Sequence, residues 1–194
     1  MANSFLNILV GFLSKFIISG GKDKEIQIEI PLGVPKESRS NMDSNGIDWT
    51  DETCSISKHF SVKEALWLPS WGVMHIPSEE EKANILEQAA KMDLIRDFLG
   101  VPVRIHCWIR PILNNPNSEY NGQDYNALVK GAKNSSHKIG KATDYDAEGL
   151  NCDDVRSKLE PMLEEWQIRM ERMPGGNWVH NDCGPVASNR YFIP

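Results

Sequence analysis

The segment SSHKIGKATDYD contains a histidine and an aspartate that could bind one metal ion together. His137 and Asp144 stand seven residues apart, with Gly140 between them. A catalytic Zn²⁺ takes about three imidazole or carboxylate ligands from the protein and keeps one position for water. The segment therefore supplies two ligands, and the third has to come from elsewhere in the chain.

His180 is the candidate for the third ligand. It stands in NWVHND, a stretch that predicts a short strand with Trp178, His180 and Asp182 on one face. By itself, the spacing of His137 and Asp144 does not distinguish a metal site from ordinary polar side chains, because such pairs also occur by chance. Trp178 likewise has two interpretations: it stacks on a substrate, or it packs in the core.

Several local patterns predict the elements that position these residues. SEEEKANILEQAAKMDLIRDFLG predicts a long helix, in which Ser78 and Glu81 form a capping box and Gly100 ends the last turn. VPVRIHCWIR predicts a strand with alternating faces: Val103, Ile105, Cys107 and Ile109 on one, and Arg104, His106, Trp108 and Arg110 on the other. KATDYD predicts a short strand, and the chain from Asn151 to Glu171 predicts a helix interrupted at Pro161.

The N-terminal part of the chain predicts an extension to this domain. Residues 1–24 predict a hydrophobic helix, because the stretch 5–18 is apolar except for Lys15 and large apolar residues fall at helical spacing: Phe5, Leu9, Phe12 and Phe16. The segment lacks the features of a secretory signal. We expect this helix to dock on a partner or to lie on a membrane, with packing on its own domain as the alternative. EIQIEIP predicts a strand and residues 31–55 a linker, so we expect a strand and linker over 25–56 and the domain over 57–194.

Composition excludes some classes of function. The chain of 194 residues has a net charge of −6, and its 21 Lys and Arg residues form no dense run, which argues against nucleic acid as a partner. Cys54, Cys107, Cys152 and Cys183 form no C-x-x-C pair, so neither a zinc knuckle nor a redox dithiol is indicated. Two disulfides and four free thiols both remain compatible with the sequence.

The segment from Ser135 to Asp144 resembles the S-x-H-x-x-G-x-A-x-D signature of the zinc D-Ala-D-Ala carboxypeptidases, the related phage endolysins and the hedgehog signalling domain. Other segments resemble the same family in the same order: HFSVKEAL, DFLGVPVRI, CWIRP, YNALVKGAKNSSH and GNWVHNDCGP. The resemblance covers about residues 57 to 194.

This resemblance implies an α+β fold with a small antiparallel sheet flanked by helices, and one Zn²⁺ per chain. By position, it implies His137, Asp144 and His180 as the ligands. It further implies that Arg110 binds a substrate carboxylate or carbonyl, and that Ser135 steadies the first-ligand loop or contacts the substrate.

The activity implied is hydrolysis of peptidoglycan stem or cross-link peptides next to D-amino acids. We expect a phage enzyme that acts in the virion or in the host periplasm and cell wall. Its hydrophobic N-terminal helix then suits anchoring to phage structural proteins.

The general base is the point at which this sequence departs from the family. Many members place a carboxylate three or six residues before the last His, where this chain has Asn177 and Pro174. Asp182 and Glu171 are the available substitutes, and strand periodicity favours Asp182 unless it only orients Arg110 or a ligand. If neither acts as a base, the expected protein is a zinc-stabilised binding or structural module of a phage tail or baseplate.

Overall fold

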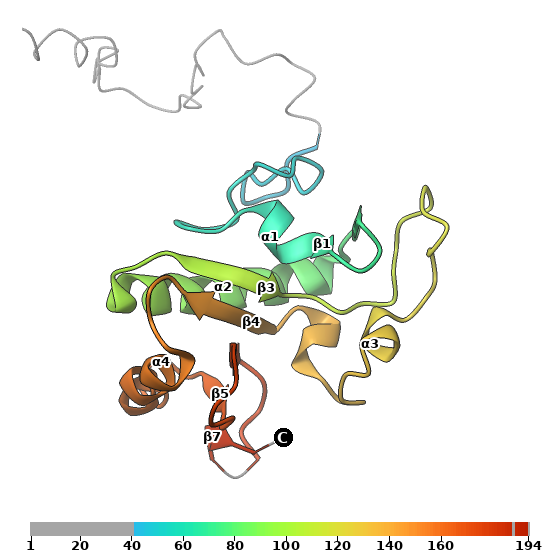
Figure 1. Cartoon of the computed structure of the whole chain (residues 1–194). Helices are drawn as coiled ribbons and strands as arrows, with labels where there is room; N and C mark the ends of the chain where they lie inside the picture. The colour runs from blue at the N-terminus through green and yellow to red at the C-terminus, as the bar shows by residue number, and fades with distance from the viewer. Residues whose placement is uncertain (1–40, 188, 194) are drawn as a thin grey trace, which may run out of the picture. The chain divides into compact units, whose positions relative to one another are not determined.

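The computed structural model describes residues 41–187 and 189–193, so the predicted helix over 1–24 and strand at 25–31 lie outside the described residues. The described part is an α+β domain in which helices flank a small, mainly antiparallel sheet (Figure 1). This confirms the expected fold class for the domain. No helix found in this part of the chain combines the length and the apolar character that crossing a membrane requires.

The main sheet of the described residues has five strands in the order β3-β4-β6-β5-β7. Their bounds are β3 Val103–Cys107, β4 Ala142–Ala147, β6 Val179–Asp182, β5 Arg169–Glu171 and β7 Tyr191–Phe192. The pairs are antiparallel except for β5 with β7, which is parallel and makes the sheet mixed. A separate two-stranded sheet joins β1 (Trp67–Leu68) to β2 (Val73–Met74).

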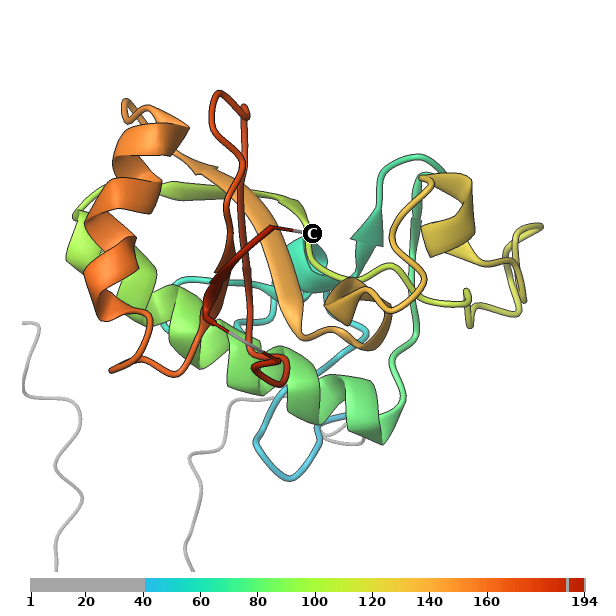
Figure 2. The same ribbon diagram turned by 90° about the horizontal axis from the view of Figure 1, so that it is seen from below.

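The long helix α2 (Glu79–Leu99) forms as its sequence predicts. Ser78 and Glu81 make both hydrogen bonds of the capping box, and Gly100 ends the helix with a φ of 70°. Inside the domain, the Gln88 side chain donates to Thr143 Oγ1 at 3.0 Å and to a backbone carbonyl of β6. Helix α2 thus covers the sheet face opposite the predicted metal ligands of β4 and β6, and Figure 2 shows it running along the sheet.

Three shorter helices complete the described fold: α1 (Val62–Leu66), α3 (Tyr125–Leu128) and α4 (Cys152–Leu159). Asn151 caps α4, and a 3₁₀ turn, η3 (Glu160–Met162), follows it. The prediction of one helix to Glu171 is wrong, because the chain turns at Gln167, which has a φ of 55°, and then enters β5. Pro161 lacks the N–H that a continuing helix needs, which is consistent with this ending.

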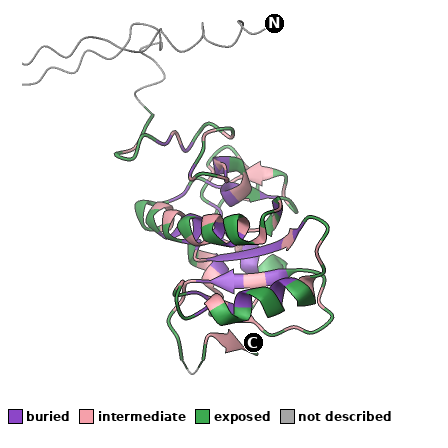
Figure 3. Cartoon of the chain, turned by 90° about the vertical axis from the view of Figure 1, so that its left-hand side faces the viewer, coloured by how far each residue is buried: buried purple, intermediate pink, exposed green. Residues whose placement is uncertain are grey.

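The core lies between α2, α4 and the sheet, where the buried residues of Figure 3 gather. Ile47 and Trp49 also belong to it, each only 7% exposed, although their segment has the composition of a linker. The sequence did not reveal this packing because the apolar residues are few and follow no period. All four cysteines are free.

Strand β3 contains a β-bulge that overturns part of its predicted alternation. The register shifts between Ile105 and Cys107, so that Cys107 pairs with Asp144 and joins the polar face. Trp108, which alternation placed on that face, is 1% exposed and donates its indole N–H to the Gly140 carbonyl. The bulge therefore delivers a thiol to the polar face and an indole to the core.

Candidate metal centre

The β4–β6 ladder brings two of the predicted ligands together. Asp144 pairs directly with His180, and Ala142 pairs with Asp182 in the same antiparallel register. Directly paired residues project from the same face of a sheet, so the Asp144 and His180 side chains meet. His180 Nδ1 lies 2.8 Å from Asp144 Oδ1.

A short 3₁₀ turn, η2 (Ser136–Ile139), holds the third predicted ligand, His137. Ser135 caps this turn by accepting a hydrogen bond from the His137 N–H at 3.3 Å. Gly140 ends it with a φ of 78°, and a Cβ there would lie 2.8 Å from Ile85 of α2. Glycine is thus required both for the backbone conformation and for the close approach of α2.

The three donor atoms form a small triangle. His137 Nε2 lies 3.1 Å from Asp144 Oδ1 and 3.2 Å from His180 Nδ1. Ligands about 2.0–2.1 Å from a tetrahedral Zn²⁺ lie roughly 3.3 Å from one another. The donor set and its spacing therefore fit a tetrahedral ion with one position left open.

Hydrogen bonds on the outer ring nitrogens orient both histidines for this role. His137 Nδ1 lies 2.8 Å from the Trp108 carbonyl, which can only accept, so Nδ1 carries the proton and Nε2 is free to bind metal. His180 Nε2 lies 3.2 Å from Asp182 Oδ2, which leaves His180 Nδ1 as the nitrogen that can bind a metal. Once both rings are neutral, each presents a lone pair to the centre of the triangle, so metal binding requires the protonated His137 to release one proton.

The charges of the metal-free site also favour a cation at its centre. Burial disfavours the charged imidazolium, but the Asp144 carboxylate outweighs this effect and raises the pKa of His137 to about 9. Burial would raise the pKa of Asp144, yet the neighbouring histidines hold it well below its usual range. The buried carboxylate thus retains a cation beside it, and a metal ion satisfies the same requirement.

A second donor set shares two of these residues: Cys107, His137 and Asp144 also lie close enough to hold a metal ion. However, Cys107 Sγ approaches His137 at Nδ1, at 3.9 Å, which is the nitrogen already bonded to Trp108. His180 Nδ1 instead approaches His137 at its Nε2 nitrogen, at 3.2 Å. We therefore favour His180 as the third ligand, while the structure shows a group that could hold a metal ion without identifying the ion.

Asp182 lies behind His180 and is fixed by its own partners. Its two oxygens accept from Arg169 Nε at 2.7 Å and Arg169 Nη2 at 2.9 Å, and the Gly184 N–H donates to it at 2.7 Å. Burial would raise the pKa of this carboxyl, but its bonds to His180 and Arg169 lower it. A carboxylate held in this way orients His180 and is a poor proton acceptor.

Arg110 makes an ion pair with Asp144 through the carboxylate oxygen that faces away from the histidines. Its backbone N–H also donates to the His137 carbonyl at 2.8 Å, which ties the end of the β3 segment to the turn η2. Its guanidinium therefore stands at the rim of the donor triangle, where it can bind a second carboxylate.

A cavity of about 320 Å³ opens over the donor triangle. Every site residue expected from the sequence lines it: Arg110, Ser135, His137, Asp144, Glu171, Trp178, His180 and Asp182. Trp178 is 38% exposed, which favours a surface role over a core role. The side chain of Glu171 makes no hydrogen bond or ion pair within the described part of the chain, so its carboxylate is free.

Sequence reasoning missed three further residues of this site: Cys107, Arg169 and Phe192. Alternation in β3 predicts Cys107 on the face opposite Arg104 and His106, and only the bulge reverses this. Arg169 was predicted in a helix, and its pairing with Asp182 depends on β5 instead. Phe192 reaches the cavity through the parallel β5–β7 pairing, for which the sequence has no local signal.

Comparison with known proteins found no matching protein-family model, no matching curated protein and no matching solved structure. The functional interpretation therefore depends on the chemistry of the site itself. That chemistry consists of a group that could hold a metal ion at the base of an open cavity, with an arginine at its rim and a free carboxylate in its wall.

Proposed function

We propose that this chain is a zinc metallopeptidase that hydrolyses peptidoglycan stem or cross-link peptides next to D-amino acids, as a phage lytic or virion-associated enzyme. The observation that carries the proposal is the donor triangle of His137, Asp144 and His180, with an open fourth position beneath a cavity. The resemblance of SSHKIGKATD and GNWVHNDCGP to the zinc carboxypeptidase signature supports the choice of reaction.

A Zn²⁺ bound there would polarise the scissile carbonyl and lower the pKa of its water towards about 7. The chain's own groups do the rest. Arg110 binds the carboxylate of the substrate and fixes the peptide in the cavity. Ser135 holds the turn that carries His137, and Asp182 holds the His180 ring.

The surroundings of the two candidate bases favour Glu171 over Asp182, which reverses the preference drawn from strand periodicity. A base has to be free to accept a proton and to pass it on. Glu171 lines the cavity without a partner among the described residues, whereas Asp182 is bonded to Arg169, His180 and a backbone N–H. We assign the proton transfer from water to the leaving amine to Glu171.

Digestion of purified peptidoglycan by the zinc-loaded protein tests this function. We expect new muropeptides by mass spectrometry, their loss on chelation and their return with added Zn²⁺. His180→Ala should abolish both metal binding and product, while Cys107→Ser should retain both. A protein that binds one equivalent of Zn²⁺ but releases no product from any peptidoglycan would overturn the peptidase assignment.

The second candidate is a zinc-stabilised binding or structural module without catalysis. Asn177, an exposed residue, favours it, because many members of the family carry a carboxylate at this position. This candidate predicts that chelation lowers the unfolding temperature while no muropeptide changes. The digestion described above therefore separates the two functions.

A further inference from the structure

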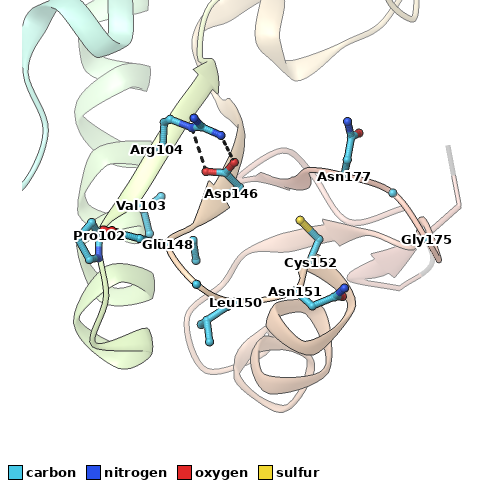
Figure 4. A pocket seen from close by; sticks show the side chains of 13 residues that line it. Pro102, Val103, Arg104, Asp146, Glu148, Leu150, Asn151, Cys152, Gly175 and Asn177 are labelled. Atoms are coloured by element: carbon cyan, nitrogen blue, oxygen red, sulfur yellow. Dashed lines mark hydrogen bonds and ion pairs between the residues drawn. The ribbon is translucent and has the colours of Figure 1, made fainter.

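A second and larger cavity, of about 750 Å³, lies beyond the metal centre along β3 and β4. We call it the distal pocket and define it by Arg104, Asp146, Glu148, Asn151, Cys152 and Asn177. In Figure 4, the paired side chains of Arg104 and Asp146 stand on one side of the opening, and Cys152 and Asn177 stand on the other. The proposed peptidase reaction does not use any of these residues.

The distal pocket is connected to the metal centre through shared lining residues. A small cavity between them is lined by His106, Asp144, Asn177 and Trp178. Asp144 and Trp178 also line the cavity over the donor triangle, and Asn177 also lines the distal pocket. His106 Nε2 further contacts Asp146 of the distal pocket at 3.2 Å. The shared residues place the three cavities next to one another, and we treat them together as one groove.

The order of residues along β3 gives this groove a direction. Arg104 lies near the beginning of the strand, at the distal pocket, and His106 follows at the small cavity. Cys107 then pairs with Asp144 at the metal centre, and Arg110 lies beyond the end of the strand. If Arg110 binds the substrate carboxylate, the scissile bond lies at the metal and the acyl side of the peptide extends toward the distal pocket.

The charges of the distal pocket differ from those at Arg110. Arg104 is already paired with Asp146, whereas the exposed Glu148 carboxylate makes no hydrogen bond or ion pair within the described residues. One cation and two carboxylates give the lining a net negative charge, which attracts cations into a cleft. The unpaired charge is therefore suited to an ammonium group.

We propose that the distal pocket is a subsite for a free amine on the acyl side of the substrate, with Glu148 as its counter-ion. The inference rests on the proposed function, because the metal centre fixes where the scissile bond lies. Glu148 lies in the turn that follows β4, four residues past Asp144, so the two Cα atoms are at most roughly 13 Å apart. A lysine-type side chain on the second residue before the scissile bond spans about the same distance, roughly 7 Å of backbone and about 6 Å of side chain.

The test uses two tripeptides with the zinc-loaded full chain: Nα-acetyl-L-Lys-D-Ala-D-Ala with a free ε-amine, and the same peptide acetylated on that amine. We expect a higher kcat/KM for the free amine, by about two- to five-fold, the value of an exposed ion pair. In Glu148→Gln this ratio should fall toward one. Glu165→Gln, which changes an exposed carboxylate outside both cavities, should keep the wild-type ratio.

Binding of the same peptides to the chelated protein, measured by titration calorimetry, gives a readout without turnover. The free-amine peptide should bind more tightly to the wild type than to Glu148→Gln. If the peptides are cleaved but the kcat/KM ratio of free to acetylated amine is the same in the wild type and in Glu148→Gln, the subsite is wrong and the peptidase assignment stands. If the wild type cleaves neither peptide, the proposed function fails. A calorimetric preference for the free-amine peptide would then still support the subsite, and equal binding of the two peptides would reject the subsite.

Discussion

Glu171 and Asp182 are carboxylates on neighbouring strands, and both line the cavity that contains His180. Their surroundings give them different chemistry, because Arg169 neutralises Asp182 while Glu171 has no partner among the described residues. The three residues of the donor triangle could be picked out from the sequence, because His137 and Asp144 stand in one motif and His180 in another, and the structure brings them together. The base could not, because nothing in the sequence shows which carboxylate is already bonded.

We predict opposite defects for the two carboxylate variants. Glu171→Gln should lower kcat by about 10²–10⁴-fold, the usual contribution of a general base, with about one Zn²⁺ retained. Asp182→Asn should instead weaken zinc binding by roughly 10–100-fold, as expected when a ligand loses its orienting partner. Peptide hydrolysis and metal analysis, with Glu165→Gln as the control, distinguish these outcomes. A fully metal-loaded Asp182→Asn without turnover would reverse the assignment.

Among the elements, those with local end signals could be predicted and those set by pairing could not. Helix α2 follows from its capping box and its terminal glycine. Strand β5 has only three residues, and its short pattern was also compatible with a helix, so its identity depends on pairing with β6 and β7. The bulge in β3 likewise appears only when the strand is aligned with β4.

The start of α2 should make stability depend on pH. Burial would raise the pKa of Glu81, but hydrogen bonds from His75 and Ser78 lower it below 4.5. A lowered carboxyl pKa means that the stabilisation is present above pH 4.5 and is lost as the pH falls through the folded-state pKa.

Glu81→Ala should therefore reduce the free energy of unfolding at pH 7 by about 1–2 kcal/mol. The difference from the wild type should shrink as the pH falls below 4.5. Glu80→Ala is the matched control, because Glu80 is an exposed carboxylate in the same helical turn. Urea unfolding at several pH values measures both, and equal losses in the two variants would argue against the capping contacts.

At the scale of the whole described domain, the core begins earlier in the chain than its composition indicates. Trp49 is 7% exposed and donates its indole N–H to Asp43 at 2.7 Å, and Ile47 packs beside it in the same core cluster. Composition describes only the average polarity of a segment. The burial of two large apolar side chains is enough to hold the segment against the core of the domain, even when the rest of it is polar.

Trp49→Ala should consequently lower the free energy of unfolding by about 3–5 kcal/mol, as for a large buried aromatic residue. Met42→Ala, at a residue that is 45% exposed, should change it by less than about 0.5 kcal/mol. Denaturant unfolding of the full-length variants measures both. A Trp49→Ala protein as stable as the wild type would show that this segment does not unfold cooperatively with the domain.

The ion pair between Arg110 and Asp144 connects two binding equilibria. In the proposed peptidase, Asp144 shares its charge between the metal and Arg110, and Arg110 shares its charge between Asp144 and the substrate carboxylate. When the carboxylate of a peptide binds Arg110, the ion pair between Arg110 and Asp144 weakens, and Asp144 becomes a stronger ligand for the metal. Thermodynamic reciprocity then requires that zinc tighten the peptide by the same factor by which the peptide tightens zinc. A substrate would thus help to retain the ion on which its own cleavage depends.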